Sequence, residues 1–159
     1  MEKFTKDTFK PEDFTFVDLG LPSGRLWASE NAPGHYTHDE AEQTFGEFLP
    51  KGAAMAELIE ECRIEWNAKE AGLDITGPNG NSIFLPASGY IFPGERIVAC
   101  DGDAGYYWTR MRYVPNSDSF AGSSQANARN LSFNSGNVNP LNRSSRSNGF
   151  SVRPCREFV

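Results

Sequence analysis

The residues best able to do covalent chemistry in this chain are three cysteines, Cys62, Cys100 and Cys155. None belongs to a C-x-x-C pair or has a histidine close by in sequence, so their spacing does not indicate a metal site. No His or Lys stands near enough in sequence to lower a thiol pKa and create a nucleophile. We therefore expect three buried free thiols, with a Cys100–Cys155 disulfide as the alternative.

Two further groups could hold a metal ion. His35 and His38 are followed by Asp39 and Glu40, but no third ligand stands in a suitable place, so we expect a solvated helix start. Residues 101–103, Asp-Gly-Asp, resemble the opening of a calcium loop but lack its downstream Glu, and we expect a turn. No Ser/His/Asp arrangement, phosphate-cradling glycine loop or paired carboxylates stand out. The sequence therefore predicts no catalytic residue, no metal site and no cofactor.

A segment rich in Asn and Ser near the C-terminus is the part of the chain that indicates non-covalent recognition. Of the 33 residues from 116 to 148, 17 are Asn or Ser, yet apolar residues recur among them. These are Phe120, Leu131, Phe133, Val138 and Leu141. The aromatic cluster of residues 105–108 precedes the run, and the alternating residues 149–154 follow it. This pattern indicates a fixed scaffold that carries an interchangeable polar surface, because Asn, Ser, Tyr and Arg are favoured at recognition surfaces. Turn-forming residues in long loops are the alternative.

Length and charge narrow the class of protein. The 159 residues are enough for one domain with a real core. Residues 1–107 carry 8 Lys and Arg against 19 Asp and Glu, whereas residues 108–159 carry 7 Arg, no Lys and 2 acidic residues. An Arg-rich segment suits an acidic or sugar-like partner, or it simply neutralises the acidic part within the fold. The net charge of −6 argues against nucleic-acid binding. No apolar run is long enough for membrane insertion.

The elements that would position these residues are short. We expect residues 1–13 to form a loose, flexible arm and residues 14–159 to form a single domain. Helices are predicted at 38–48, with Thr37 as the N-cap, and at 53–62, where apolar residues recur at helical spacing. Apolar/polar alternation and turn residues predict the strands. They are residues 14–19, 25–29, 63–67, 72–76, 82–86, 89–93, 106–113, 129–133 and 149–153. One or two helices set apart from many short antiparallel strands indicate an α+β fold.

Several motifs in this order resemble a known family. They are the stretch of residues 16–28 (FVDLGLPSGRLWA), residues 80–90 (GNSIFLPASGY), residues 105–108 (GYYW), Leu131-x-Phe133 and residues 149–154 (GFSVRP). Together they resemble the major paralogous domain of Bacteroidetes-type surface proteins. The last third is similar to the variable proteins of diversity-generating retroelements. Both groups look like members of the C-type lectin-like fold, which formylglycine-generating enzymes share.

The resemblance implies a non-enzymatic protein whose region of about residues 108–148 forms a diversifiable binding face. Scaffold positions would be Trp108, Leu131, Phe133, Val138, Phe150 and Val152. Contact or diversified positions would be Arg110, Arg112, Tyr113, Asn127, Arg129, Asn130, Ser132, Asn134, Asn142, Arg143, Ser144 and Ser145. The implied partner is a protein or glycan receptor on a cell surface, and a homo-oligomer would suit display. With no leader peptide visible, we expect a phage tail or virion component, or an extracellular surface, with the protein cytoplasmic before release.

Two other functions fit parts of the pattern. A cell-surface interaction or structural module with one fixed partner would share the same fold. An oxidase related to formylglycine-generating enzymes would need a reactive cysteine pair, and only Cys100 and Cys155 could supply one. Neither stands in a motif of that family. The sugar-site triplets of calcium-dependent lectins, Glu-Pro-Asn and Gln-Pro-Asp, are absent too, so calcium-dependent sugar binding is not predicted.

Overall fold

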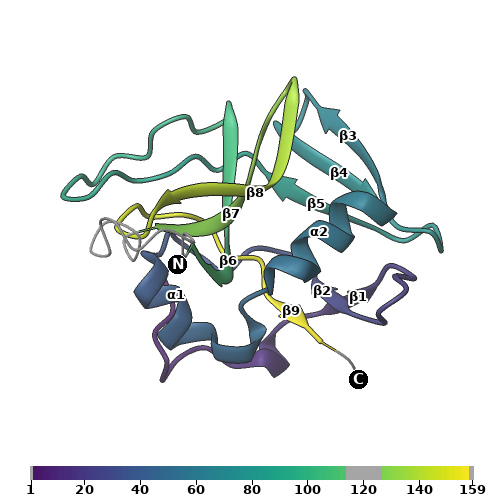
Figure 1. The fold of residues 1–159 in the computed structure, drawn as a ribbon, viewed down its shortest axis with the longest axis horizontal. Helices are drawn as coiled ribbons and strands as arrows, with labels where there is room; N and C mark the ends of the chain where they lie inside the picture. Colours follow the sequence, from purple (N-terminus) through teal and green to yellow (C-terminus); the bar gives the residue numbers. More distant parts are fainter. Residues whose placement is uncertain (1, 114–126, 158–159) are drawn as a thin grey trace.

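Short elements joined by long connections make up the chain. The computed structural model describes residues 2–113 and 127–157 (Figure 1). In chain order the elements are η1 (Pro11–Asp13), β1 (Phe16–Asp18), β2 (Leu26–Ala28), α1 (His38–Phe45), η2 (Gly46–Phe48), α2 (Gly52–Glu61), β3 (Arg63–Asn67), β4 (Gly72–Thr76), β5 (Ser82–Pro86), β6 (Ala104–Arg112), β7 (Asn127–Asn134), β8 (Asn137–Ser145) and β9 (Cys155–Arg156). Neither α-helix is long and apolar enough to span a bilayer.

The strands form three antiparallel sheets of three strands each, in the orders β1-β2-β9, β3-β4-β5 and β6-β7-β8. The first sheet joins the two ends of the chain, because β9 pairs with β2 through Trp27 and Cys155. Helix α2 packs against β6, β7 and β8, whereas α1 packs against β6 (Figure 1). The predicted α+β class is confirmed, with two short helices and the strands in small sheets of their own.

The two helices begin where local chemistry favours it. Thr37 is the N-cap of α1 and forms a capping box, in which its hydroxyl accepts from the Glu40 N–H and the Glu40 carboxylate accepts from the Thr37 N–H. The helix predicted for residues 38–48 breaks into α1 and η2 at Gly46, whose φ of 51° suits glycine. Helix α2 agrees with the prediction to within one residue and buries Met55 and Leu58.

The β3-β4-β5 sheet agrees with the sequence prediction in all three strands. Elsewhere the agreement is partial. Residues 89–93 and 149–153 are not strands of a sheet but extended segments held by isolated bridges, such as Tyr36 to Phe150 and Ile91 to Gly149. Strand β8 was not predicted at all. Asn, Ser and Pro have low strand propensity, and β8 is held instead by its register with β7.

The β6-β7-β8 sheet divides the core in two because both of its faces are covered. On one face, Tyr107, Leu131 and Phe133 join the cluster packed around α2. On the other face, Trp108, Ala128 and Phe150 join the cluster packed around α1. Gly105 is the register partner of Phe133, and glycine is required there because a Cβ would overlap the Phe133 ring. The predicted scaffold residues Trp108, Leu131, Phe133, Phe150 and Val152 are all buried, and Val138 is half-buried.

The N-terminal residues are packed rather than loose. The Phe9 ring lies 4.8 Å from the Phe45 ring, centroid to centroid, and the Phe4 N–H donates to the Tyr36 hydroxyl at 2.8 Å. Lys3 forms an ion pair with Glu40. A flexible arm was expected because residues 1–13 are mostly polar and charged, but two phenylalanines anchor the segment to the α1 cluster.

The motif of residues 149–154 contributes a buried arginine. Arg153 is 1% exposed, and its guanidinium donates to the backbone carbonyls of Ala28 and Phe84 and to the Asn31 side chain. These acceptors belong to β2, β5 and the loop after β2, so one side chain joins segments that lie far apart in sequence. Burial lowers the pKa of Arg153 to about 10. The arginine therefore serves the fold rather than a surface site.

Candidate ligand-binding face

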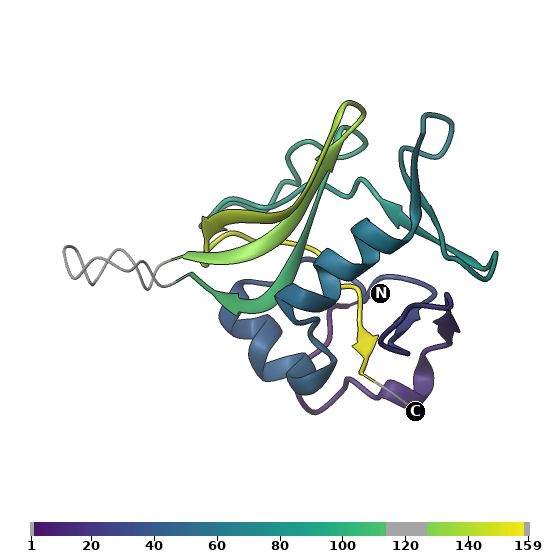
Figure 2. The same ribbon diagram turned by 45° about the vertical axis from the view of Figure 1, so that its right-hand side comes forward.

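The predicted contact residues lie on or beside the three strands of the β6-β7-β8 sheet, in which β7 and β8 form a long hairpin (Figure 2). They do not form one surface. Neighbouring residues of a strand point to opposite faces, so Arg129 and Asn130 are separated by the sheet itself. One group of predicted residues lies on the α1 side, with Tyr106 and Trp108, and another lies on the opposite side, with Tyr113.

A shallow hollow opens on the α1 side of the sheet. It has a volume of about 190 Å³ and is lined by Tyr90, Phe92, Tyr106, Ser144, Asn148 and Phe150. We call it the aromatic hollow. Its rings are mutually packed, with Tyr106 stacked on Phe150 at 5.0 Å and Tyr90 edge-on to Tyr106 at 5.1 Å. Phe92 is 51% exposed and extends the apolar surface outwards. Burial raises the pKa of Tyr106, so its phenol stays protonated near neutral pH.

Polar side chains continue from the rim of the aromatic hollow along the same face. Ser144 lies at the rim, and its hydroxyl accepts from the Asn142 amide at 3.2 Å. Ser132 is the register partner of Tyr106 and is half-exposed. Asn130 was predicted as a contact position, but it is fully buried, and its carbonyl oxygen accepts from Asn142 at 3.2 Å. It cannot reach a partner, because it faces the core across from Trp108.

The opposite face carries Tyr113, Arg129 and Arg143. Arg129 and Arg143 are direct register partners across β7 and β8, and both guanidinium groups lie over the Tyr113 ring. Asn127 and Ser145, the next pair in the register on this face, are half-buried. Asn134 lies at the exposed hairpin turn, where its side chain accepts from the Gly136 N–H.

Two of the predicted contact arginines are engaged within the chain. Arg110 donates to the backbone oxygens of Leu49 and Glu47, both at 3.1 Å. Arg112 forms two hydrogen bonds with the Glu42 carboxylate, the shorter at 2.6 Å. Both side chains tie β6 to the α1–η2 region, which argues against a contact role for them. Their sequence neighbourhood of Arg and aromatic residues gave no sign of these internal partners.

The surroundings of His38 differ from the solvated helix start that was expected there. His38 is fully buried, with Nε2 2.8 Å from the Thr109 carbonyl oxygen and its ring 5.0 Å from the Trp108 ring. Burial lowers its pKa, so the ring is neutral at pH 7. Asp39 and Glu42 place carboxylate oxygens near its Nδ1, all within 4.8 Å.

His38, Asp39 and Glu42 are residue types that can coordinate a metal ion, but arginine guanidinium groups already bind the nitrogen and oxygen atoms that would do so. The Arg146 guanidinium donates to His38 Nδ1 at 3.2 Å and also binds the carboxylates of Asp39 and Glu42. A cation would have to displace this guanidinium, so the group fits an internal ion-pair network better than a metal site. Arg146 was not among the predicted residues, and its neighbours in sequence, which are mostly Ser and Asn, gave no sign of its distant acidic partners on α1.

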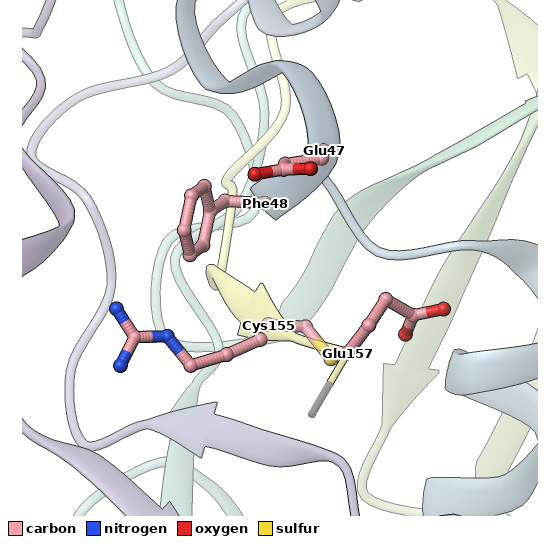
Figure 3. Close-up of a pocket in the computed structure, with 5 residues that line it drawn as sticks. Glu47, Phe48, Cys155 and Glu157 are labelled. Atoms are coloured by element: carbon pink, nitrogen blue, oxygen red, sulfur yellow. The ribbon is translucent and has the colours of Figure 1, made fainter. Parts of the chain in front are cut away.

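A second pocket, of about 310 Å³, lies between η2 and β9 and is lined in part by Cys155 (Figure 3). Burial, followed by the nearby Glu157 charge, raises the pKa of Cys155 to about 12, so the thiolate is not formed near neutral pH. Glu157 is held by Arg25 at 2.6 Å and Lys51 at 3.1 Å. Among the residues that line this pocket, Cys155 is therefore not a nucleophile near neutral pH, and the Glu157 carboxylate is held in ion pairs.

All three cysteines are free. Cys155 is buried and Cys62 is half-buried, as expected in outline, and burial raises the pKa of Cys62 to about 11. Cys100 differs from the expectation because it is exposed, at a turn where its own φ is 59°. Comparisons of the chain with known protein families, with characterised proteins and with solved structures find no match.

Proposed function

We propose that this chain is a non-enzymatic ligand- or receptor-binding protein with a C-type lectin-like fold, akin to the variable proteins of diversity-generating retroelements. It recognises a protein or glycan receptor on a cell surface and works on a virion or another extracellular surface. The observation that carries the proposal is the aromatic hollow, rimmed by Ser144 and Asn148 of the Asn/Ser-rich segment.

The shape of the aromatic hollow suits a large partner. An apolar centre with a polar rim is the usual anatomy of a recognition surface. Its volume of about 190 Å³ is below the roughly 300–1,000 Å³ of pockets that enclose small molecules. The hollow can accept one side chain or one sugar ring, so most of the contact area would have to come from the polar surface around it.

Side chains along β7 and β8 alternate between the two faces of the sheet, and this alternation separates scaffold positions from surface positions. Leu131 and Phe133 are buried in the α2 cluster, whereas Ser132, Asn142 and Ser144 stay partly exposed on the other face. Side chains in the second group can change without opening the core, as loop residues vary on a rigid base in other recognition proteins. This supports the part of the proposal that concerns diversification.

The chemistry of the thiols supports a non-enzymatic role. An oxidase related to formylglycine-generating enzymes needs reactive cysteines, but the pKa of Cys155 is raised to about 12. Cys100 is exposed and forms no disulfide. Cys62 has Glu57 and Glu61 nearby, and burial with these charges raises its pKa as well. A raised pKa disfavours the thiolate that such chemistry requires.

Sequencing tests the diversified part of the proposal. The gene segment for residues 108–148 would be read in a population grown from one ancestor. We expect substitutions at adenine-bearing codons for Asn142 and Ser144, while Leu131 and Phe133 stay constant. The buried Asn130 is an internal control and should also stay constant. A uniform segment, or changes spread equally over buried and exposed positions, would contradict diversification.

A binding experiment tests the hollow itself. The full chain would be applied to an array of glycans and peptides, together with Ser144→Arg, which fills the rim. Ser135→Arg is the matched control, because Ser135 is exposed in the β7–β8 turn. We expect the neutral ligands of the native chain to be lost by the first variant and kept by the second. Binding that survives Ser144→Arg would place the site elsewhere.

A further inference from the structure

Arg129 and Arg143 form an arginine pair in an unusual setting. They are direct register partners on β7 and β8, and like charges placed directly opposite each other weaken an antiparallel pair. Their guanidinium carbons lie 4.8 Å and 4.5 Å from the centroid of the Tyr113 ring. The electron-rich ring face attracts both cations, so the tyrosine offsets part of the repulsion and holds the two groups together.

Among the described residues some arginines form ion pairs with carboxylates and others, including the arginine pair, do not. Ion pairs with carboxylates are made by Arg25, Arg63, Arg112 and Arg146. Arg129 uses Nη1 to donate to the Leu141 carbonyl at 3.0 Å, and Arg143 makes no hydrogen bond within residues 2–113 and 127–157. A guanidinium has five N–H donors, so the pair keeps most of its donors for a ligand.

We infer that Tyr113, Arg129 and Arg143 form an anion-binding subsite that takes a carboxylate from an acidic peptide segment of the partner. This inference rests on the proposed function and adds a second contact region, on the sheet face opposite the aromatic hollow. Two adjacent guanidinium groups can each donate to one carboxylate, in charge-assisted hydrogen bonds that are stronger than neutral ones. Tyr113 fixes the position of both groups before the ligand arrives.

A peptide carboxylate fits the charge distribution better than a polyanion does. The chain has a net charge of −6, and 19 acidic residues lie within residues 1–107. This charge repels a densely charged polymer such as nucleic acid or a sulfated polysaccharide. One or two carboxylates spaced along a peptide meet the local positive charge of the arginine pair without approaching the acidic surface closely.

The test measures binding of a short labelled Glu-Gly repeat peptide with only two Glu residues to the full chain by fluorescence anisotropy at low salt. A Gln-Gly repeat of the same length is the control ligand. Arg129→Gln and Arg143→Gln should each weaken binding at least ten-fold, and Tyr113→Leu should weaken it too. Arg63→Gln is the matched control variant, because it removes the same charge from an exposed arginine on β3, and it should change binding less than two-fold. Circular dichroism checks that each variant is folded.

Three results would overturn the inference. Equal weakening by Arg63→Gln would mean that only net charge matters. Equal binding of the Gln-Gly repeat would mean that the carboxylates play no part. Binding of polygalacturonate without binding of the Glu-Gly repeat would assign the subsite to an acidic glycan instead. None of these results touches the Ser144→Arg test, so a failure here is distinguishable from a failure of the proposed function.

Discussion

Trp108 and Arg143 provide the sharpest test of the division between scaffold and surface. Trp108 is fully buried, its indole N–H donates to the Tyr36 carbonyl at 2.7 Å, and its ring lies 4.3 Å from the Phe150 ring. Replacing a buried aromatic side chain by Ala costs about 3–5 kcal/mol, because a cavity remains. The lost hydrogen bond adds about 1 kcal/mol. The sum is a large share of the roughly 5–15 kcal/mol that stabilises a domain.

A milder variant keeps the experiment interpretable if Trp108→Ala does not fold. Trp108→Phe retains the contact with Phe150 and loses the indole N–H. The Tyr36 carbonyl stays satisfied, since it also accepts from the Phe150 N–H at 2.9 Å. We expect a cost of about 2 kcal/mol, from the smaller ring and the lost bond. For a chain of this size that lowers Tm by about 4–8 °C.

Arg143→Ala is the matched surface variant and should change stability by less than about 0.5 kcal/mol, since Arg143 is exposed. Thermal and urea unfolding, followed by circular dichroism, would give both values. The division between scaffold and surface fails if Arg143→Ala costs as much as Trp108→Phe, because the hairpin face would then be part of the core. It also fails if Trp108→Ala leaves the unfolding free energy unchanged.

Three more predictions concern titration and burial. Burial lowers the pKa of His38, so the unfolded chain binds the proton more readily than the folded chain does. The contribution of His38 to the free energy of unfolding is complete above about pH 6.5 and falls below that pH, by at most about 1.4 kcal/mol per pH unit. Urea unfolding of His38→Gln between pH 7.5 and 5.5 should lack this pH dependence. Arg153→Met should cost about 3–5 kcal/mol in thermal unfolding, because three acceptors, one buried and two half-buried, lose their donor; a change below about 1 kcal/mol would refute its structural role. A thiol reagent should modify Cys100 in the folded chain but Cys155 only after unfolding, and equal rates would contradict the burial of Cys155.

Elements whose signal is local could be predicted from the sequence. The capping box at Thr37 and Glu40, the apolar spacing of α2 and the three strands β3 to β5 each depend on residues within a few positions of one another. The buried aromatic anchors Trp108 and Phe150 were expected only through the family resemblance, which implied scaffold roles for both.

What could not be predicted depends on distant partners. Strand β8 is made of residues with poor strand propensity and exists through its pairing with β7. From the sequence, His38 belongs to a solvated helix start, but in the fold β6 covers it with the Thr109 carbonyl and the Trp108 ring. Asn130 and Arg112 have the right chemistry for recognition, yet the fold buries one and pairs the other with Glu42. No spacing rule in the sequence carries such information.

The β6-β7-β8 sheet has a consequence for how the molecule opens. Because consecutive residues of β6, Tyr107 and Trp108, belong to different core clusters, neither cluster can come apart without exposing the other. Backbone amides of β6 should therefore exchange with deuterium only through global unfolding, while those at the exposed β7–β8 turn exchange through local opening. The rate of amide exchange would therefore differ along one sheet. The hairpin turn would open locally while β6, the strand beneath the aromatic hollow, stays folded.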